Sequence, residues 1–163
     1  MEIPLEKRYD ILNQIVRASH FEWLAAAKAL AGEGVSELDL VLEYWEIVGH
    51  DTARSYLKRL NPNQPLPRQI AENFAFSSLC MGEDVVVVEG EDDQEAFVQH
   101  NGCPWYEWHM RQGKLEQDQP GCDKWVEVFM ADINKELSSD VKWQTLKSLP
   151  NGDDVCLRRF WVE

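Results

Sequence analysis

The sequence has few basic residues for its length. It contains 16 Lys and Arg against 29 Asp and Glu among 163 residues, a formal net charge of −13. Proteins that bind nucleic acid or dock on anionic membranes depend on clustered basic charge. We therefore expect neither a nucleic-acid partner nor a membrane partner.

Long apolar stretches are also missing. The longest are residues 23–31, which Lys28 interrupts, and residues 85–88. Both fall far short of the roughly 20 residues that span a bilayer. The opening sequence MEIPLEKRYD carries charges where a secretory signal has its apolar segment. We expect a cytoplasmic protein, in which the four cysteines are thiols, metal ligands or catalytic groups rather than disulfides.

Several catalytic motifs are absent from the sequence. It has no serine nucleophile elbow, no glycine-rich phosphate loop, no HExxH and no CxxC pair. The sequence therefore gives no support to nucleotide-dependent or zincin chemistry.

The acidic excess is concentrated in the second half of the sequence. Residues 1–80 hold 11 acidic and 8 basic residues, and residues 81–163 hold 18 acidic and 8 basic residues.

The first half has the periodicity of helices. Apolar residues recur at steps of three and four between residues 5 and 30, and Gly32 and Gly34 follow. Ser36 and Asp39 predict a capping box for a second helix, residues 37–48, which Gly49 would close. Two further helices are expected at residues 52–60 and 67–80, on either side of the proline-rich segment NPNQPLP.

The second half predicts strands around one helix. The β-branched run 84–90 and the segment 94–100 are typical of paired strands. A helix is expected over 122–137, and residues 141–149 and 155–162 flank a turn and predict a β-hairpin. The predicted fold is α+β, a single domain over residues 1–163. An N-terminal helical layer (1–80) precedes β-β-α-β-β with a mainly antiparallel sheet and a ligand pocket (83–163).

Reactive side chains gather after the second predicted strand. The segment 100–109 reads HNGCPWYEWH, and Cys122 follows it. Thiolate and imidazole ligands suit zinc or iron, so a metal site is one interpretation. Its candidate ligands are His100, Cys103, His109 and Cys122. The spacings match no familiar zinc motif, and no other cofactor is indicated.

Thiol catalysis is the second interpretation of the same residues. Cys103 follows a strand and an Asn-Gly break, which would leave it near solvent at the sheet edge. Cys122 would lie in the first turn of a helix, where the dipole favours a thiolate. His100 or His109 would then act as the acid or base. The alternative is that these cysteines simply fill space in the core, the interpretation we favour for Cys80.

Aromatic residues surround the same segment. Trp105 and Trp108 lie beside Cys103, and a pocket for a small organic ligand would use such side chains. A tryptophan-rich core is the alternative. On the last predicted strand Arg158 shares a face with Cys156, where it could hold a substrate carboxylate.

The second half resembles a known family. The pattern is Cys-Pro after a strand, Gly-Cys at a helix start, and Gly-Asp-x-x-Cys entering the last strand, here Cys103-Pro104, Gly121-Cys122 and residues 152–156. It is similar to the L-2-amino-thiazoline-4-carboxylic acid hydrolase-like family, and more distantly to the 4-vinyl reductase small-molecule-binding domain. The resemblance covers about residues 83–163. It implies an α+β fold with an antiparallel sheet, a pocket near Cys103, Cys122, Asp153 and Cys156, and, for hydrolase-like members, opening of a cyclic C–N bond.

Two functions follow as hypotheses. The first is a small hydrolase that opens a cyclic C–N bond in an amino-acid-like or heterocyclic substrate. Cys103 or Cys122 would be its nucleophile, with Trp105, Trp108, Asp153, Cys156 and Arg158 contacting the substrate. The second is a non-catalytic domain that binds a small molecule or a metal. The N-terminal helices between residues 5 and 60 could also form a homodimer surface.

Overall fold

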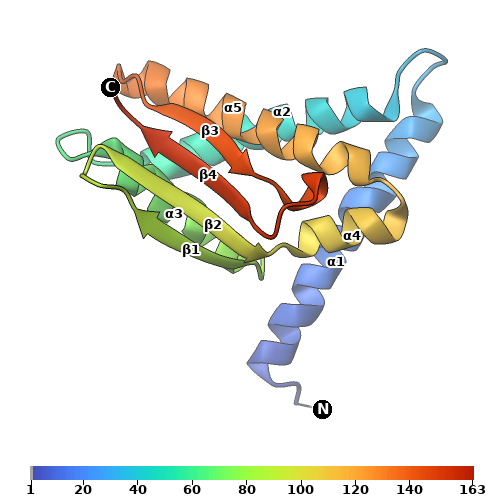
Figure 1. Cartoon of the computed structure of the whole chain (residues 1–163). Coiled ribbons are helices and arrows are strands. Elements are labelled where there is room, and N and C mark those ends of the chain that lie inside the picture. The colour runs from blue at the N-terminus through green and yellow to red at the C-terminus, as the bar shows by residue number, and fades with distance from the viewer. Residues whose placement is uncertain (1) are drawn as a thin grey trace.

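Helices come first along the chain, as the sequence predicts, but there are three of them before the sheet and not the four expected. The structure, a computed structural model, describes residues 2–163. The helices are α1 (Leu5–Leu30), α2 (Glu37–Leu57) and α3 (Leu66–Cys80) (Figure 1). The predicted capping box is present, because Asp39 N donates to Ser36 Oγ at 3.0 Å and Ser36 N donates to Asp39 Oδ2 at 2.9 Å.

The second half contains the four predicted strands and the predicted helix, together with a short helix and two 3-10 turns. Their order along the chain is β1 (Asp84–Glu89), β2 (Glu95–Gly102), α4 (Pro104–Gln112), a 3-10 turn η1 (Leu115–Gln117), α5 (Asp118–Leu137), β3 (Lys142–Lys147), a 3-10 turn η2 (Leu149–Asn151) and β4 (Cys156–Trp161). The fold class is α+β, as expected. The sheet is antiparallel throughout, with the strand order β1-β2-β4-β3.

Helix α2 is longer than predicted. The expected break at Gly49 is wrong, and one helix replaces the two expected at 37–48 and 52–60. Gly49 lies inside the helix where α2 meets α5. A Cβ placed on it would come within 2.7 Å of Val128 Cβ. Gly49 is therefore a close-packing residue and not a helix terminator.

Helix α5 approaches α2 through a second glycine. A Cβ on Gly121 would lie 2.6 Å from Trp45 Cδ1 and 3.2 Å from Val41 Cγ1. One glycine on each helix thus faces the other helix. Because Gly121 meets Val41 and Trp45 while Gly49 meets Val128, the two helices run in the same direction, side by side in Figure 1.

The two central strands put their reactive side chains on one buried face. Ala96, Val98 and His100 alternate inward on β2, and Cys156, Arg158 and Phe160 do so on β4. In the pairing of these strands His100 lies opposite Cys156, and Val98 lies opposite Arg158. This face packs on α3 and α5, around a core that includes Phe74, Phe129 and Phe160. The predicted placement of Arg158 beside Cys156 is confirmed.

The N-terminal part of helix α1 projects beyond the rest of the fold (Figure 1). The inward side of α1 carries the buried residues Asn13, Arg17, His20, Phe21 and Leu24. Most of its other apolar side chains are exposed, including Leu5, Leu12, Trp23 and Leu30. Within residues 2–163, the structure shows no helix with the length and apolarity needed to cross a membrane.

Candidate functional site

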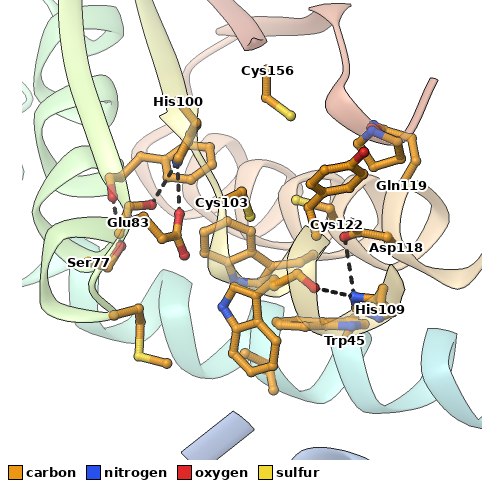
Figure 2. Close-up of a pocket in the computed structure, with 18 of the residues that line it drawn as sticks. Trp45, Ser77, Glu83, His100, Cys103, His109, Asp118, Gln119, Cys122 and Cys156 are labelled. Atoms are coloured by element: carbon orange, nitrogen blue, oxygen red, sulfur yellow. Dashed lines mark hydrogen bonds and ion pairs between the residues drawn. The ribbon is translucent and has the colours of Figure 1, made fainter. Parts of the chain in front are cut away.

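One cavity lies where the helices meet the buried face of the sheet. Its volume is about 330 Å³. In Figure 2, Glu83 and His100 lie on one side, Asp118 and His109 on the other, and Cys103 between them. The lining residues come from all five α-helices, from the two central strands and from the segments that connect these elements. They are Val16, Tyr44, Trp45, Val48, Thr52, Phe74, Ser77, Ser78, Met81, Glu83, His100, Cys103, Trp105, Tyr106, His109, Asp118, Gln119, Cys122, Trp125, Pro150, Cys156 and Arg158.

Most residues singled out in the sequence meet in this cavity. The seven that line it are His100, Cys103, Trp105, His109, Cys122, Cys156 and Arg158. Trp108 and Asp153 lie elsewhere. Trp108 stacks on Phe21 of α1 with ring centroids 6.0 Å apart, and Asp153 Oδ2 accepts a hydrogen bond from Ser148 N at 2.7 Å. Both of these residues therefore have structural contacts of their own.

The thiols occupy different positions from those expected. Helix α5 begins at Asp118, so Cys122 lies in its second turn and not its first. The earlier start is possible because Pro120, its third residue, needs no intrahelical N–H partner. Cys103 is half-buried in the cavity wall and not solvent-facing at a sheet edge, whereas Cys80, expected to pack inside, is exposed.

Burial keeps the cavity thiols protonated. It raises the pKa of Cys103 well above its ordinary value, with Glu83 adding to the effect. Burial also raises the pKa of Cys122 to about 12, although nearby Arg158 opposes the change. The pKa of Cys156 is raised for the same reason. A protonated thiol is a poor nucleophile, so none of the three is activated in this state.

The cavity histidines hydrogen-bond away from the thiols. His109 Nδ1 donates to Trp105 O at 2.9 Å and lies 3.7 Å from Asp118 Oδ1. His100 Nε2 lies 3.0 Å from both Ser78 Oγ and Glu83 Oε2. Over residues 2–163 the structure has no hydrogen bond between a histidine and a thiol. A nucleophile with its base in contact, which thiol catalysis requires, is not assembled here.

The candidate zinc or iron site has no ligand set in the described chain. Residues 2–163 contain no group of three or more His, Cys, Asp or Glu side chains placed to hold a metal ion. His100, Cys103, His109 and Cys122 share the cavity wall. They are spread around it rather than directed to one point.

Four buried polar atoms of the lining residues have no hydrogen-bond partner among the described residues. They are His100 Nδ1, His109 Nε2, Asp118 Oδ2 and Arg158 Nε. Buried polar atoms are normally paired, because leaving one unpaired costs free energy. A ligand that reached one of these atoms would supply the hydrogen bond that the atom lacks.

Sequence reasoning missed several members of the site. Trp45, Phe74, Glu83 and Asp118 are separated from the reactive segment along the chain or lie among many similar acidic residues. The two aromatic residues carry only a helical pattern in sequence. The acidic residues have no motif, and only their burial in the fold distinguishes them.

His20 is a buried histidine next to the cavity that the sequence does not single out as part of the site. It is buried, and its ring packs edge-on against Tyr44 and Trp105, with centroids 4.7 and 5.5 Å away. Neither ring nitrogen has a partner within the described chain. Burial, with nearby His109, lowers the pKa of His20 to about 4. At neutral pH His20 is therefore uncharged and packs as an aromatic ring, but without the hydrogen bonds expected of a buried histidine.

The comparisons with known proteins establish the fold alone. No protein-family model matches this sequence, and no curated protein matches it. A crystal structure of trafficking protein particle complex subunit 3 from Naegleria fowleri, covalently bound to palmitic acid, aligns with 94% of this chain and 96% of that one. The TM-score is 0.57 and the sequence identity 11%. The shared architecture includes the helices before the sheet, and it confirms the α+β prediction.

Thiol alkylation tests the protonation of the cavity cysteines. Because a raised pKa leaves little thiolate at neutral pH, iodoacetamide should modify exposed Cys80 well before Cys103, Cys122 and Cys156 at about pH 7.5. The rate at Cys122 should keep rising as the pH approaches its pKa of about 12. Mass spectrometry of peptides measures each site.

The control for this experiment is urea-unfolded protein, in which the four thiols should react at similar rates. Faster modification of Cys103 or Cys122 than of Cys80 in the folded protein at neutral pH would contradict the assignment, and would show an activated thiol.

Proposed function

We propose that this chain is a non-catalytic binding domain that encloses a small, largely apolar molecule in its cavity. The carrying observation is the cavity itself, about 330 Å³ lined mainly by aromatic and aliphatic side chains with a few converging polar groups. Ligand pockets of about 300–1,000 Å³ have this composition. Its volume favours a compact ligand.

The chemistry of the walls supports binding over turnover. Three protonated thiols add polarisable, weakly polar surface. The aromatic rings of Trp45, Trp105 and Phe74 supply most of the rest. The neighbour of similar fold supports this proposal, since it holds palmitic acid.

Hydrolysis of a cyclic C–N bond stays a prediction. What favours it is that Cys103, Cys122, His100 and His109 share one cavity. What opposes it is that both histidines donate or pair elsewhere. A ligand would have to break one of these pairs before a histidine could serve a thiol.

A stripe of residues on α1 supports the expected homodimer. Residues spaced alternately four and three apart lie along one side of the helix, the seam spacing of a coiled coil: Leu5, Tyr9, Leu12, Val16, Ser19, Trp23, Ala26 and Leu30. Val16, at the edge of this stripe, also lines the cavity, and Tyr9 Oη donates to Leu79 O. The residues most available to a second copy are therefore Leu5, Leu12, Trp23 and Leu30. Leu5 is 81% exposed, Trp23 75% and Leu30 89%. We propose that the stripe packs against α1 of a second copy, since two-fold dimers are the commonest assemblies and this spacing fits another helix.

Filling the cavity tests the ligand proposal. Val48 of α2 lines it, so Val48→Trp should occupy its volume and weaken binding of octanol at least tenfold, measured by calorimetry. Ile47→Trp adds the same ring on the exposed side of α2 and should leave the affinity within about twofold of wild type. Val48→Phe repeats the test with a smaller ring. Unchanged octanol binding in both Val48 variants, or no octanol binding by the wild type, would contradict the proposed ligand-binding function.

Charges placed on α1 test the dimer. Leu12→Glu with Trp23→Glu puts two carboxylates in the stripe and should convert a dimer to a monomer in sedimentation experiments. Gln14→Glu with Ala25→Glu adds the same charges on another exposed side of α1 and should leave the dimer intact. A monomeric wild type at high concentration, or equal effects of the two pairs, would contradict the interface.

A further inference from the structure

Asp118 is the least compensated charged group of the cavity. It is the first residue of α5 and only 8% exposed, and its Oδ2 has no partner within the described chain. Its Oδ1 lies 3.7 Å from His109 Nδ1, but that nitrogen donates to Trp105 O at 2.9 Å. Burial raises the pKa of Asp118, as expected for a carboxylate that lacks donors.

The other two charged groups of the cavity already have partners. Glu83 Oε2 lies 3.0 Å from His100 Nε2. Arg158 Nη2 donates to Cys122 Sγ at 3.0 Å and lies 3.5 Å from Asp123 Oδ1, and its buried Nε has no partner within the described chain. Two carboxylates against one guanidinium give the lining a formal charge of −1 when its histidines are neutral. The buried guanidinium of Arg17 lies beside this lining, over the Trp105 ring at 5.8 Å, and interacts with Glu83 rather than with Asp118. A cation entering the cavity would therefore meet its least compensated charge at Asp118.

Aromatic rings lie next to this carboxylate. Gly121 follows Asp118 by one helical turn, and a Cβ on Gly121 would lie 2.6 Å from the Trp45 ring. The Trp45 ring is thus pressed against the first turns of α5. Trp105 lies edge-on to Trp45, with ring centroids 5.9 Å apart. Ring faces attract organic cations, most strongly when water is excluded.

We propose that the ligand of this cavity carries a protonated amine, which Asp118 binds beside Trp45 while the apolar remainder lies among the other rings. This inference rests on the proposed binding function and adds the chemical class of the ligand. An ammonium group donates to the unpaired Oδ2 and neutralises a buried charge. The net charge of −13 favours approach of the same class of ligand.

Three probes that share an eight-carbon chain and differ only in the polar group test which class of ligand the cavity prefers, separately from whether it binds a ligand at all. Octylamine, octanol and octanoate are titrated by calorimetry at about pH 7, where the amine is protonated and octanoate ionised. We expect octylammonium to bind at least tenfold more tightly than octanol, about 1.4 kcal/mol, and octanoate to bind more weakly than both.

Matched variants assign the preference to one residue. Asp118→Asn keeps the shape and should reduce octylammonium affinity about tenfold while changing octanol affinity less than about threefold. Glu116→Gln removes the same charge at an exposed position two residues earlier and should change neither. Circular dichroism checks that α5 remains folded in each variant.

The outcomes are distinct. Equal affinities for octanol and octylammonium overturn the inference and leave the binding function standing. Tighter octanoate binding overturns it in favour of an anion held by Arg158. Loss of the preference in Glu83→Gln but not in Asp118→Asn overturns the assignment to Asp118. Failure of all three probes to bind wild type removes both the binding function and the inference.

Discussion

The close approach of α2 and α5 is the constraint on which the cavity depends. One glycine on each helix faces the other helix, Gly49 against Val128 and Gly121 against Trp45. Polar contacts reinforce the pair, with Lys124 Nζ 3.0 Å from Glu46 Oε2 and Trp125 Nε1 donating to Thr52 Oγ1 at 2.8 Å. Any larger side chain at either glycine would separate the helices. The absence of a Cβ at Gly49 and Gly121 therefore determines where this wall of the cavity lies.

This packing brings apolar aromatic rings and cysteine thiols into the wall of the same cavity. Trp45 and Trp125 come from the two paired helices, and the thiols come from the second turn of α5, the residue between β2 and α4, and the start of β4. Burial in the same wall also raises the pKa values of the thiols. The features that make the cavity a good container for an apolar ligand therefore make it a poor environment for an unassisted thiolate.

Local pattern was enough to predict most of the fold, because caps, periodicity and turns act over a few residues. The capping box at Ser36, the paired strands and the placement of Arg158 beside Cys156 all follow from such signals. Gly49 was misread as a helix end because its function depends on Val128, 79 positions away along the chain. The convergence of Cys103, Cys122 and Cys156 was expected, but the contributions of Trp45, Glu83 and Asp118 depend on tertiary packing that no local pattern encodes.

The central claim is that a ligand enters among the aromatic rings of this cavity. The seven tryptophans offer a direct measurement, because Trp45, Trp105 and Trp125 line the cavity whereas Trp143 and Trp161 lie outside it. Indole N–H signals in nuclear magnetic resonance spectra of the ¹⁵N-labelled full chain, assigned by single Trp→Phe variants, would be followed during addition of octanol. The account predicts saturable shifts of the three cavity indoles with Trp143 and Trp161 unchanged. Cavity signals that stay in place, or shifts of equal size at all seven indoles, would contradict it.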